Sequence, residues 1–265
     1  MPQFKEVRHA YGFEDVAIVP GDVTINPDQT DIDLEIGHLR FTIPVLASAM
    51  DAVVSPSFAV RISQLGGLGV LNLEGVYSRY DDPQEAIDRI VQSPPEFATG
   101  LLQKMYSAPI REELIGKWVH DIKAAGATCA VSVTPQNAKR IAPIAVEAGA
   151  DLIVVQSTVT TARHVSKSYR GLIFSELVEQ TKVPVIVGNC VTYNAALELM
   201  ETGVDGILVG VGPGAACTTR EVTGVGVPQV SATIECAAAR EEHLRRTGKY
   251  VAVITDGGIR TGGDL

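Results

Sequence analysis

The sequence has few cysteines, and they form no pattern typical of a cross-linked or metal-bound fold. The four cysteines lie far apart, at positions 129, 190, 217 and 236, and include no CxxC pair. Such spacing indicates neither a disulfide framework nor a structural zinc site. The histidines are scattered as well, and we expect them to lie on surfaces or to make local hydrogen bonds: His9, His38, His120, His164 and His243.

The sequence also lacks a basic cluster, a signal segment and a long apolar run. The chain has 22 Lys and Arg against 31 Asp and Glu, and its densest basic stretch, Arg240 to Lys249, contains two glutamates. The resulting net charge of −9 argues against nucleic acid as a partner. Residues 1–6 hold no apolar signal core, and no apolar run is long enough to cross a bilayer. We therefore expect a cytoplasmic protein without a nucleic-acid or membrane partner.

The chain does contain a repeated alternation of helical segments and short apolar runs. Gly126, Gly149 and Gly203 each lie between a helical segment and an apolar run, as does the pair Gly66-Gly67. A glycine just past a helix end, followed by a continuous apolar run, is typical of a parallel strand buried on both faces. The seven predicted strands are Ile43–Ser48, Leu68–Leu71, Cys129–Val133, Leu152–Val155, Val183–Val187, Ile207–Val209 and Tyr250–Ile254. The predicted helices are Pro56–Leu65, Arg111–Ala125, Gln136–Ala148, Leu172–Thr181, Asn194–Glu201 and Ser231–Arg246.

This alternation fits either an eight-stranded βα barrel or a doubly wound open sheet. The barrel is favoured because no GxGxxG follows the first strand, and because polar and glycine-rich residues follow the strands, where barrel active sites form. We predict one α/β domain over residues 1–265, a (β/α)8 TIM-type barrel. Seven strands do not close such a barrel, so we expect the eighth unit to be absent from this chain. Residues 81–110 carry four prolines and are expected to form an irregular excursion.

One cysteine lies in a glycine-rich loop, Gly210 to Arg220 (GVGPGAACTTR), directly after an apolar run. Glycine permits backbone conformations closed to other residues, so this loop can fold its amides and carbonyls around a ligand. Cys217 is then either a nucleophile or a small buried hydrophobe, as most free cysteines are. Its Gly, Ala, Thr and Arg neighbours favour the nucleophile, because polar, electropositive surroundings lower the pKa of a thiol.

Several stretches, in the same order along the chain, resemble the IMP dehydrogenase and GMP reductase family. The clearest are Ala49-Met50-Asp51, Gly188-Asn189, the loop around Cys217, Thr223 to Gln229 (TGVGVPQ) and Asp256-Gly257-Gly258. The likeness covers essentially the whole chain and is greatest to the IMP dehydrogenase-related branch that lacks CBS domains. It implies a βα barrel that assembles as a homotetramer, with residues 81–110 in place of CBS modules.

The resemblance implies oxidoreductase chemistry at C2 of a purine nucleoside 5′-monophosphate. Purine C2 is electrophilic but aromatic, so a soft nucleophile, here Cys217, must add before hydride is exchanged with a nicotinamide cofactor. Two reactions share this adduct. One oxidises IMP to XMP with NAD and water, a step of GMP biosynthesis, and the other reduces GMP to IMP and ammonia with NADPH. The order of preference is the dehydrogenase, then the reductase, then a nucleotide-binding relative without activity.

The resemblance also implies roles for further residues, although Asp256-Gly257-Gly258 taken alone is typical of a turn. Thr219 would position water or the leaving amine. Asp256 would hold the ribose hydroxyls of a nucleotide whose contacts are Met50, Asn189, Gly214, Asp256, Gly257 and Gly258. NAD or NADP would contact Gln156, Ser157, Thr158, Gly210 and Gly212. A potassium ion would lie on the backbone carbonyls of Gly212, Gly214 and Cys217.

The sequence departs from the family pattern at several positions. Ala215 stands where many members have a phosphate-binding serine, and Ser48 lies one place after the usual serine. Gln156 replaces an aspartate on the cofactor side, which leaves the choice between NAD and NADP open. The family's flap, which carries the water-activating groups of the dehydrogenase, would lie beyond Leu265, so the direction of the reaction is open too.

Overall fold

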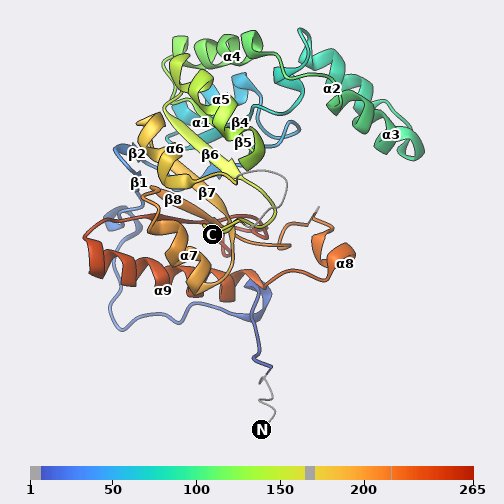
Figure 1. Ribbon diagram of the computed structural model, residues 1–265. Coiled ribbons are helices and arrows are strands. Elements are labelled where there is room, and N and C mark those ends of the chain that lie inside the picture. The colour runs from blue at the N-terminus through green and yellow to red at the C-terminus, as the bar shows by residue number, and fades with distance from the viewer. Residues whose placement is uncertain (1–6, 165–170, 216) are drawn as a thin grey trace.

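Parallel strands form one sheet in strict chain order, β3-β4-β5-β6-β7-β8-β9. The computed structural model describes residues 7–164, 171–215 and 217–265 (Figure 1). Residues 1–6, where we expect no signal core, and Ala216 of the cysteine loop lie outside these ranges. The seven strands are β3 (Leu46–Ala47), β4 (Leu68–Asn72), β5 (Ala130–Val133), β6 (Leu152–Gln156), β7 (Val185–Cys190), β8 (Gly206–Val209) and β9 (Ala252–Thr255).

The strand order confirms the predicted architecture. All neighbouring strands are parallel and sequential, as in a βα barrel, whereas a doubly wound sheet reverses its order at a switch point. Among the described residues no eighth strand joins β9 to β3. The described residues therefore form an incomplete TIM barrel of seven strands, as the sequence predicts.

Helices that follow the strands pack on the outer side of the sheet (Figure 1): α1 (Pro56–Gln64), α4 (Glu112–Ala124), α5 (Pro135–Glu147), α6 (Phe174–Thr181), α7 (Tyr193–Met200) and α9 (Gln229–Thr247). A side-chain hydroxyl caps the amino-terminal end of two of these helices. Ser55 accepts the N–H of Phe58 at the start of α1, and Thr192 accepts the N–H of Ala195 at the start of α7. Gly126, which follows α4, has a φ of 76°, the left-handed conformation expected of a helix-ending glycine.

Two apolar clusters alternate along the strands. Side chains on one face of the sheet pack against the helices, among them Leu71, Val131, Ile153, Val187 and Ile207. The alternate positions fill the barrel interior, among them Leu68, Val70, Leu152, Val154, Ile186 and Leu208. A short antiparallel hairpin of β1 (Leu34–Ile36) and β2 (Leu39–Phe41), absent from the sequence prediction, adds Ile36 and Phe41 to the interior cluster. It lies at the amino-terminal ends of the strands, since a Cβ added to Gly37 would meet the side chains of Pro184 and Asp205. The opposite end is left open.

The prediction for residues 81–110 is wrong in its local structure. This segment is not irregular but forms α2 (Pro83–Val91) and α3 (Pro95–Tyr106), which project from the barrel as an arm (Figure 1). Pro83 and Pro95 begin the two helices instead of breaking them, because a proline at the first helical position loses no hydrogen bond. Asp82 adds a side-chain cap to α2 by accepting the N–H of Glu85.

Some predicted boundaries also differ. β3 spans only Leu46–Ala47, and β7 extends beyond Val187, so that Gly188, Asn189 and Cys190 lie within the strand instead of in a loop. A register shift between Gly188 and Cys190 marks this end of β7. The remaining short elements are η1 (Phe13–Asp15), η2 (Pro27–Gln29), η3 (Val76–Ser78) and α8 (Thr219–Thr223).

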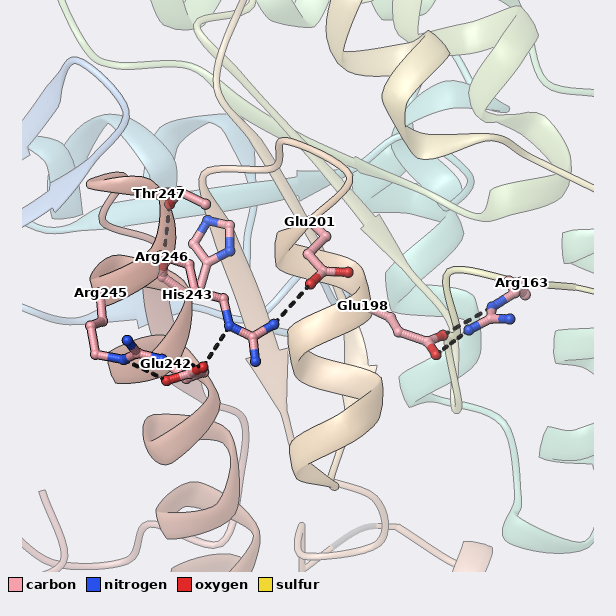
Figure 2. A network of polar contacts seen from close by, with 8 residues as sticks. All are labelled: Arg163, Glu198, Glu201, Glu242, His243, Arg245, Arg246 and Thr247. Atoms are coloured by element: carbon pink, nitrogen blue, oxygen red, sulfur yellow. Dashed lines mark hydrogen bonds and ion pairs between the residues drawn. The ribbon is translucent and has the colours of Figure 1, made fainter.

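His243, on α9, departs from the expectation for the histidines. Its side chain is buried, and within the described residues neither ring nitrogen has a hydrogen-bond partner. Figure 2 shows it beside the ion pairs that Arg246 makes with Glu242 and Glu201, neither of which involves the imidazole. Burial lowers the pKa of His243, as does the positive charge of Lys249, while Glu201 opposes the shift.

Candidate active site

The carboxyl ends of the strands open onto one cavity of about 660 Å³. Such a volume is typical of a small-molecule site. Every site residue expected from the sequence lines it: Met50, Gln156, Ser157, Thr158, Asn189, Gly210, Gly212, Gly214, Cys217, Thr219, Asp256, Gly257 and Gly258. The structure thus brings together residues that lie as far apart in the chain as Met50 and Gly258.

The same cavity has lining residues that the sequence analysis missed. Asn72 ends β4, and Ser132 and Thr134 lie at the end of β5. The signal was present, because each is a polar residue at the carboxyl end of a predicted parallel strand, where barrel sites form. Ala215 and Ser48, the positions at which the chain departs from the family pattern, line the cavity too.

Cys217 is exposed at this cavity, whereas Cys129, Cys190 and Cys236 are buried. Its exposure removes the alternative that it is a buried hydrophobe. The thiol lies 3.2 Å from the hydroxyl of Thr219 and hydrogen bonds to it. Hydrogen bonds from the side chain and backbone of Thr219 lower the pKa of the Cys217 thiol. By contrast, burial raises the pKa of Cys129 to about 12. Cys217 is therefore the thiol best suited to react near neutral pH.

The loop that carries Cys217 is packed against the segment TGVGVPQ. The aliphatic part of Arg220 passes between Gly212 and Gly226, and a Cβ added to either glycine would overlap it. The N–H of Val227 donates to the carbonyl of Val211 at 3.2 Å, and this hydrogen bond also joins the TGVGVPQ segment to the cysteine loop. The side chain of Arg220 therefore leaves no room for a Cβ at Gly212 of the cysteine loop or at Gly226 of TGVGVPQ.

The turn after β9 lies against the cysteine loop. Gly257 and Gly258 have φ values of 90° and 81°, and a Cβ on Gly257 would lie 3.5 Å from the backbone of Gly214. Here glycine is required by the backbone conformation. The Asp256-Gly257-Gly258 turn and the Cys217 loop therefore form adjoining walls of the cavity.

Asp256 is held by two side-chain amides from neighbouring strands. The Nδ2 of Asn189 donates to Asp256 Oδ2 at 2.6 Å, and the Nε2 of Gln156 donates to the same oxygen at 3.0 Å. Asn189 also donates to the carbonyl of Gly210 at 2.8 Å, which ties the pair to the start of the cysteine loop. Within the described part of the chain no hydrogen bond reaches Asp256 Oδ1, so that oxygen is available to a ligand.

Clusters of metal-ligating side chains are not found in the described part of the chain. Over residues 7–164, 171–215 and 217–265 no group of three or more His, Cys, Asp or Glu is placed to hold an ion. Backbone carbonyls are a separate case, and that of Gly214 already accepts the N–H of Cys217 at 3.0 Å. In the same ranges, no helix is both long and apolar enough to span a bilayer.

Comparisons with known proteins agree with this geometry. The family model for the IMP dehydrogenase / GMP reductase domain matches residues 10–265. An uncharacterized oxidoreductase of Mycolicibacterium smegmatis is 41% identical over 268 residues, which cover 98% of this chain and 72% of the relative. The inosine-5′-monophosphate dehydrogenase of Cryptosporidium parvum is 29% identical, over 98% of this chain and 64% of that protein.

A solved structure has the same fold. The crystal structure of an IMP dehydrogenase/GMP reductase-like protein from Corynebacterium glutamicum superimposes with a TM-score of 0.91 at 35% identity, covering 98% of this chain and 70% of that one. The family model spans nearly the whole chain and the fold of this neighbour is shared. The chain belongs to the IMP dehydrogenase / GMP reductase family and is an oxidoreductase of that family.

Proposed function

We propose that this oxidoreductase acts at C2 of a purine nucleoside 5′-monophosphate through a covalent bond to Cys217, and that its reaction is the oxidation of IMP to XMP. The observation that carries the proposal is the exposed thiol of Cys217, hydrogen bonded to Thr219, in a cavity that also contains Asp256. The thiolate adds to C2, transfer of the C2 hydride to the nicotinamide leaves a thioimidate, and attack of water on this thioimidate expels the thiol, so the cysteine is regenerated.

The cavity offers complementary groups for such a nucleotide. The free oxygen of Asp256 accepts a ribose hydroxyl, and the turn at Gly257 and Gly258 adjoins Gly214, where backbone amides can face the phosphate. Asn189 and Met50 flank the base. Because Ala215 has no hydroxyl, the phosphate makes one contact fewer than in members with serine there.

A nicotinamide cofactor, NAD or NADP, accepts or supplies the hydride when it is bound. Ser157, Thr158, Gly210 and Gly212 line the same cavity and would offer hydroxyls and backbone groups to the cofactor. Thr219 holds the attacking water or the leaving amine beside Cys217. Potassium stays a prediction, with the carbonyls of Gly212, Gly214 and Cys217 as its ligands.

The reductase, which converts GMP to IMP with NADPH, is the second candidate. The family model covers both activities, and the Mycolicibacterium smegmatis oxidoreductase, which is 41% identical, has a name that states no substrate. Cytoplasmic location and a homotetramer remain part of the proposal. The aliphatic side chains of Ile18 and Val19, 94% and 84% exposed, support a contact with a second copy of the chain.

The test is to follow the absorbance of reduced nicotinamide with two substrate pairs. IMP with NAD should produce NADH and XMP. Consumption of NADPH with GMP, together with no reaction of IMP and NAD, would replace the dehydrogenase by the reductase. If neither pair reacts although a purine nucleotide binds, the protein is a binding relative without activity.

A further inference from the structure

Gln156 replaces an aspartate that the family pattern places near the cofactor. Its amide nevertheless contacts Asp256 and Asn189, which are proposed to bind the nucleotide. It ends β6, opposite Gly188 of β7. Its Nε2 donates to Asp256 Oδ2 at 3.0 Å and lies 3.2 Å from Asn189 Oδ1. The amide of Gln156 therefore bridges a carboxylate and a carbonyl oxygen, both of which are acceptors.

These surroundings require a donor at position 156. An ionised carboxylate has acceptors only, so it would face the Asp256 carboxylate with like charge and could donate a hydrogen bond neither to Asp256 Oδ2 nor to Asn189 Oδ1. A glutamine side chain donates the hydrogen bond and is itself uncharged. The second donor to the same carboxylate oxygen, Asn189 Nδ2, also holds the carbonyl of Gly210, so it is fixed in direction by a backbone group.

We propose that Gln156 is a positioning residue that orients Asp256 for the ribose hydroxyls of the nucleotide, and that it is not an anionic acceptor for the cofactor. This inference rests on the function proposed above. Two donors on Oδ2 fix the plane of the carboxylate and turn Oδ1 to the ligand. Hydrogen bonds to a charged group are the stronger class, so loss of one donor loosens the carboxylate appreciably. Gln156 thereby determines how strongly the site prefers a ribonucleotide.

The test compares Gln156→Glu and Gln156→Leu with the wild type by calorimetric binding of IMP and of its 2′,3′-dideoxy analogue. Gln103→Glu, the same chemical change at an exposed position of α3, is the matched control. At about pH 8, both Gln156 variants should bind IMP about tenfold more weakly, while binding of the dideoxy analogue is unchanged. At about pH 5, Gln156→Glu should recover relative to the wild type, because the adjacent Asp256 carboxylate favours protonation of the introduced carboxyl, which can then donate, and Gln156→Leu should not.

Two results would overturn the inference. One is normal IMP binding by both variants with an altered KM for NAD or NADP, which would make Gln156 a cofactor residue. The other comes from nucleotide-free protein, where Gln156→Leu should shift the side-chain amide NMR signals of Asn189, and unchanged signals would contradict the coupling. If the wild type binds no purine nucleotide, the proposed function fails and the ribose role with it, whereas the NMR comparison still reports whether Gln156 and Asn189 are coupled.

Discussion

Cys217 and Thr219 form the pair on which the proposed chemistry depends. Replacing Cys217 by serine should lower turnover by about three orders of magnitude or more, because a serine hydroxyl is a far weaker nucleophile than a thiolate. Nucleotide affinity should change little. Steady-state kinetics and calorimetry measure the two effects separately. Cys190→Ser is the control, since Cys190 is buried, and an equal loss of turnover in a folded Cys190→Ser protein would refute the assignment.

The pKa of Cys217 can be measured without any substrate. Thr219 lowers this pKa, so Thr219→Val should raise it and move the pH dependence of thiol alkylation by iodoacetamide to higher pH. Thr218→Val alters the exposed neighbouring threonine and should leave the profile in place. Alkylation rates followed by mass spectrometry give both profiles. A Thr219→Val profile identical to that of the wild type would show that the hydroxyl does not tune the thiol.

At the scale of the elements, the contact between the cysteine loop and the TGVGVPQ segment should be intolerant of added atoms. A Cβ at Gly226 would overlap the stem of Arg220 and lie 2.9 Å from the carbonyl oxygen of Val211. Gly226→Ala should therefore lower kcat about tenfold or more by displacing the loop. Gly100→Ala on α3, where an added Cβ meets nothing within 4 Å, should be neutral or slightly stabilising. Equal kcat values for the two variants would contradict the packing argument.

Helix α9 should make stability depend on pH through His243. Its folded pKa lies below the unfolded value of about 6.5, so the unfolded chain binds more protons in the acid range. The free energy of unfolding should be unaffected above that pH and should fall as pH drops below it. His243→Leu should flatten this dependence, and His120→Leu, at an exposed site, should not. Urea unfolding at several pH values provides the measurement, and equal slopes in all three proteins would exclude a role for His243.

Elements with a local signature could be predicted from the sequence. Glycines that end helices and continuous apolar runs identified seven strands, because both signals lie within a few residues of the feature they mark. The β1–β2 hairpin was missed, since what stabilises it is the burial of Ile36 and Phe41 in a barrel formed by distant strands. The helices of the arm were missed because proline is common in loops as well as at the first position of helices, where Pro83 and Pro95 lie.

For the whole molecule, the site could be assembled from the sequence as a set of residues but not as a set of contacts. The barrel topology alone brings the strand ends to one rim, so the lining residues follow from the order of the motifs. The bond from Gln156 to Asp256 joins residues 100 positions apart. It depends on the register of β6 and β7, which no local pattern specifies.

The central claim is that a purine nucleotide becomes covalently attached to Cys217 during turnover. Rapid acid quenching of the protein mixed with IMP and NAD, or with GMP and NADPH, followed by peptide mass spectrometry, tests it directly. The account predicts a nucleotide adduct on the peptide that contains Cys217, present during turnover and absent from Cys217→Ser. Turnover that proceeds without an adduct and persists in Cys217→Ser would contradict it.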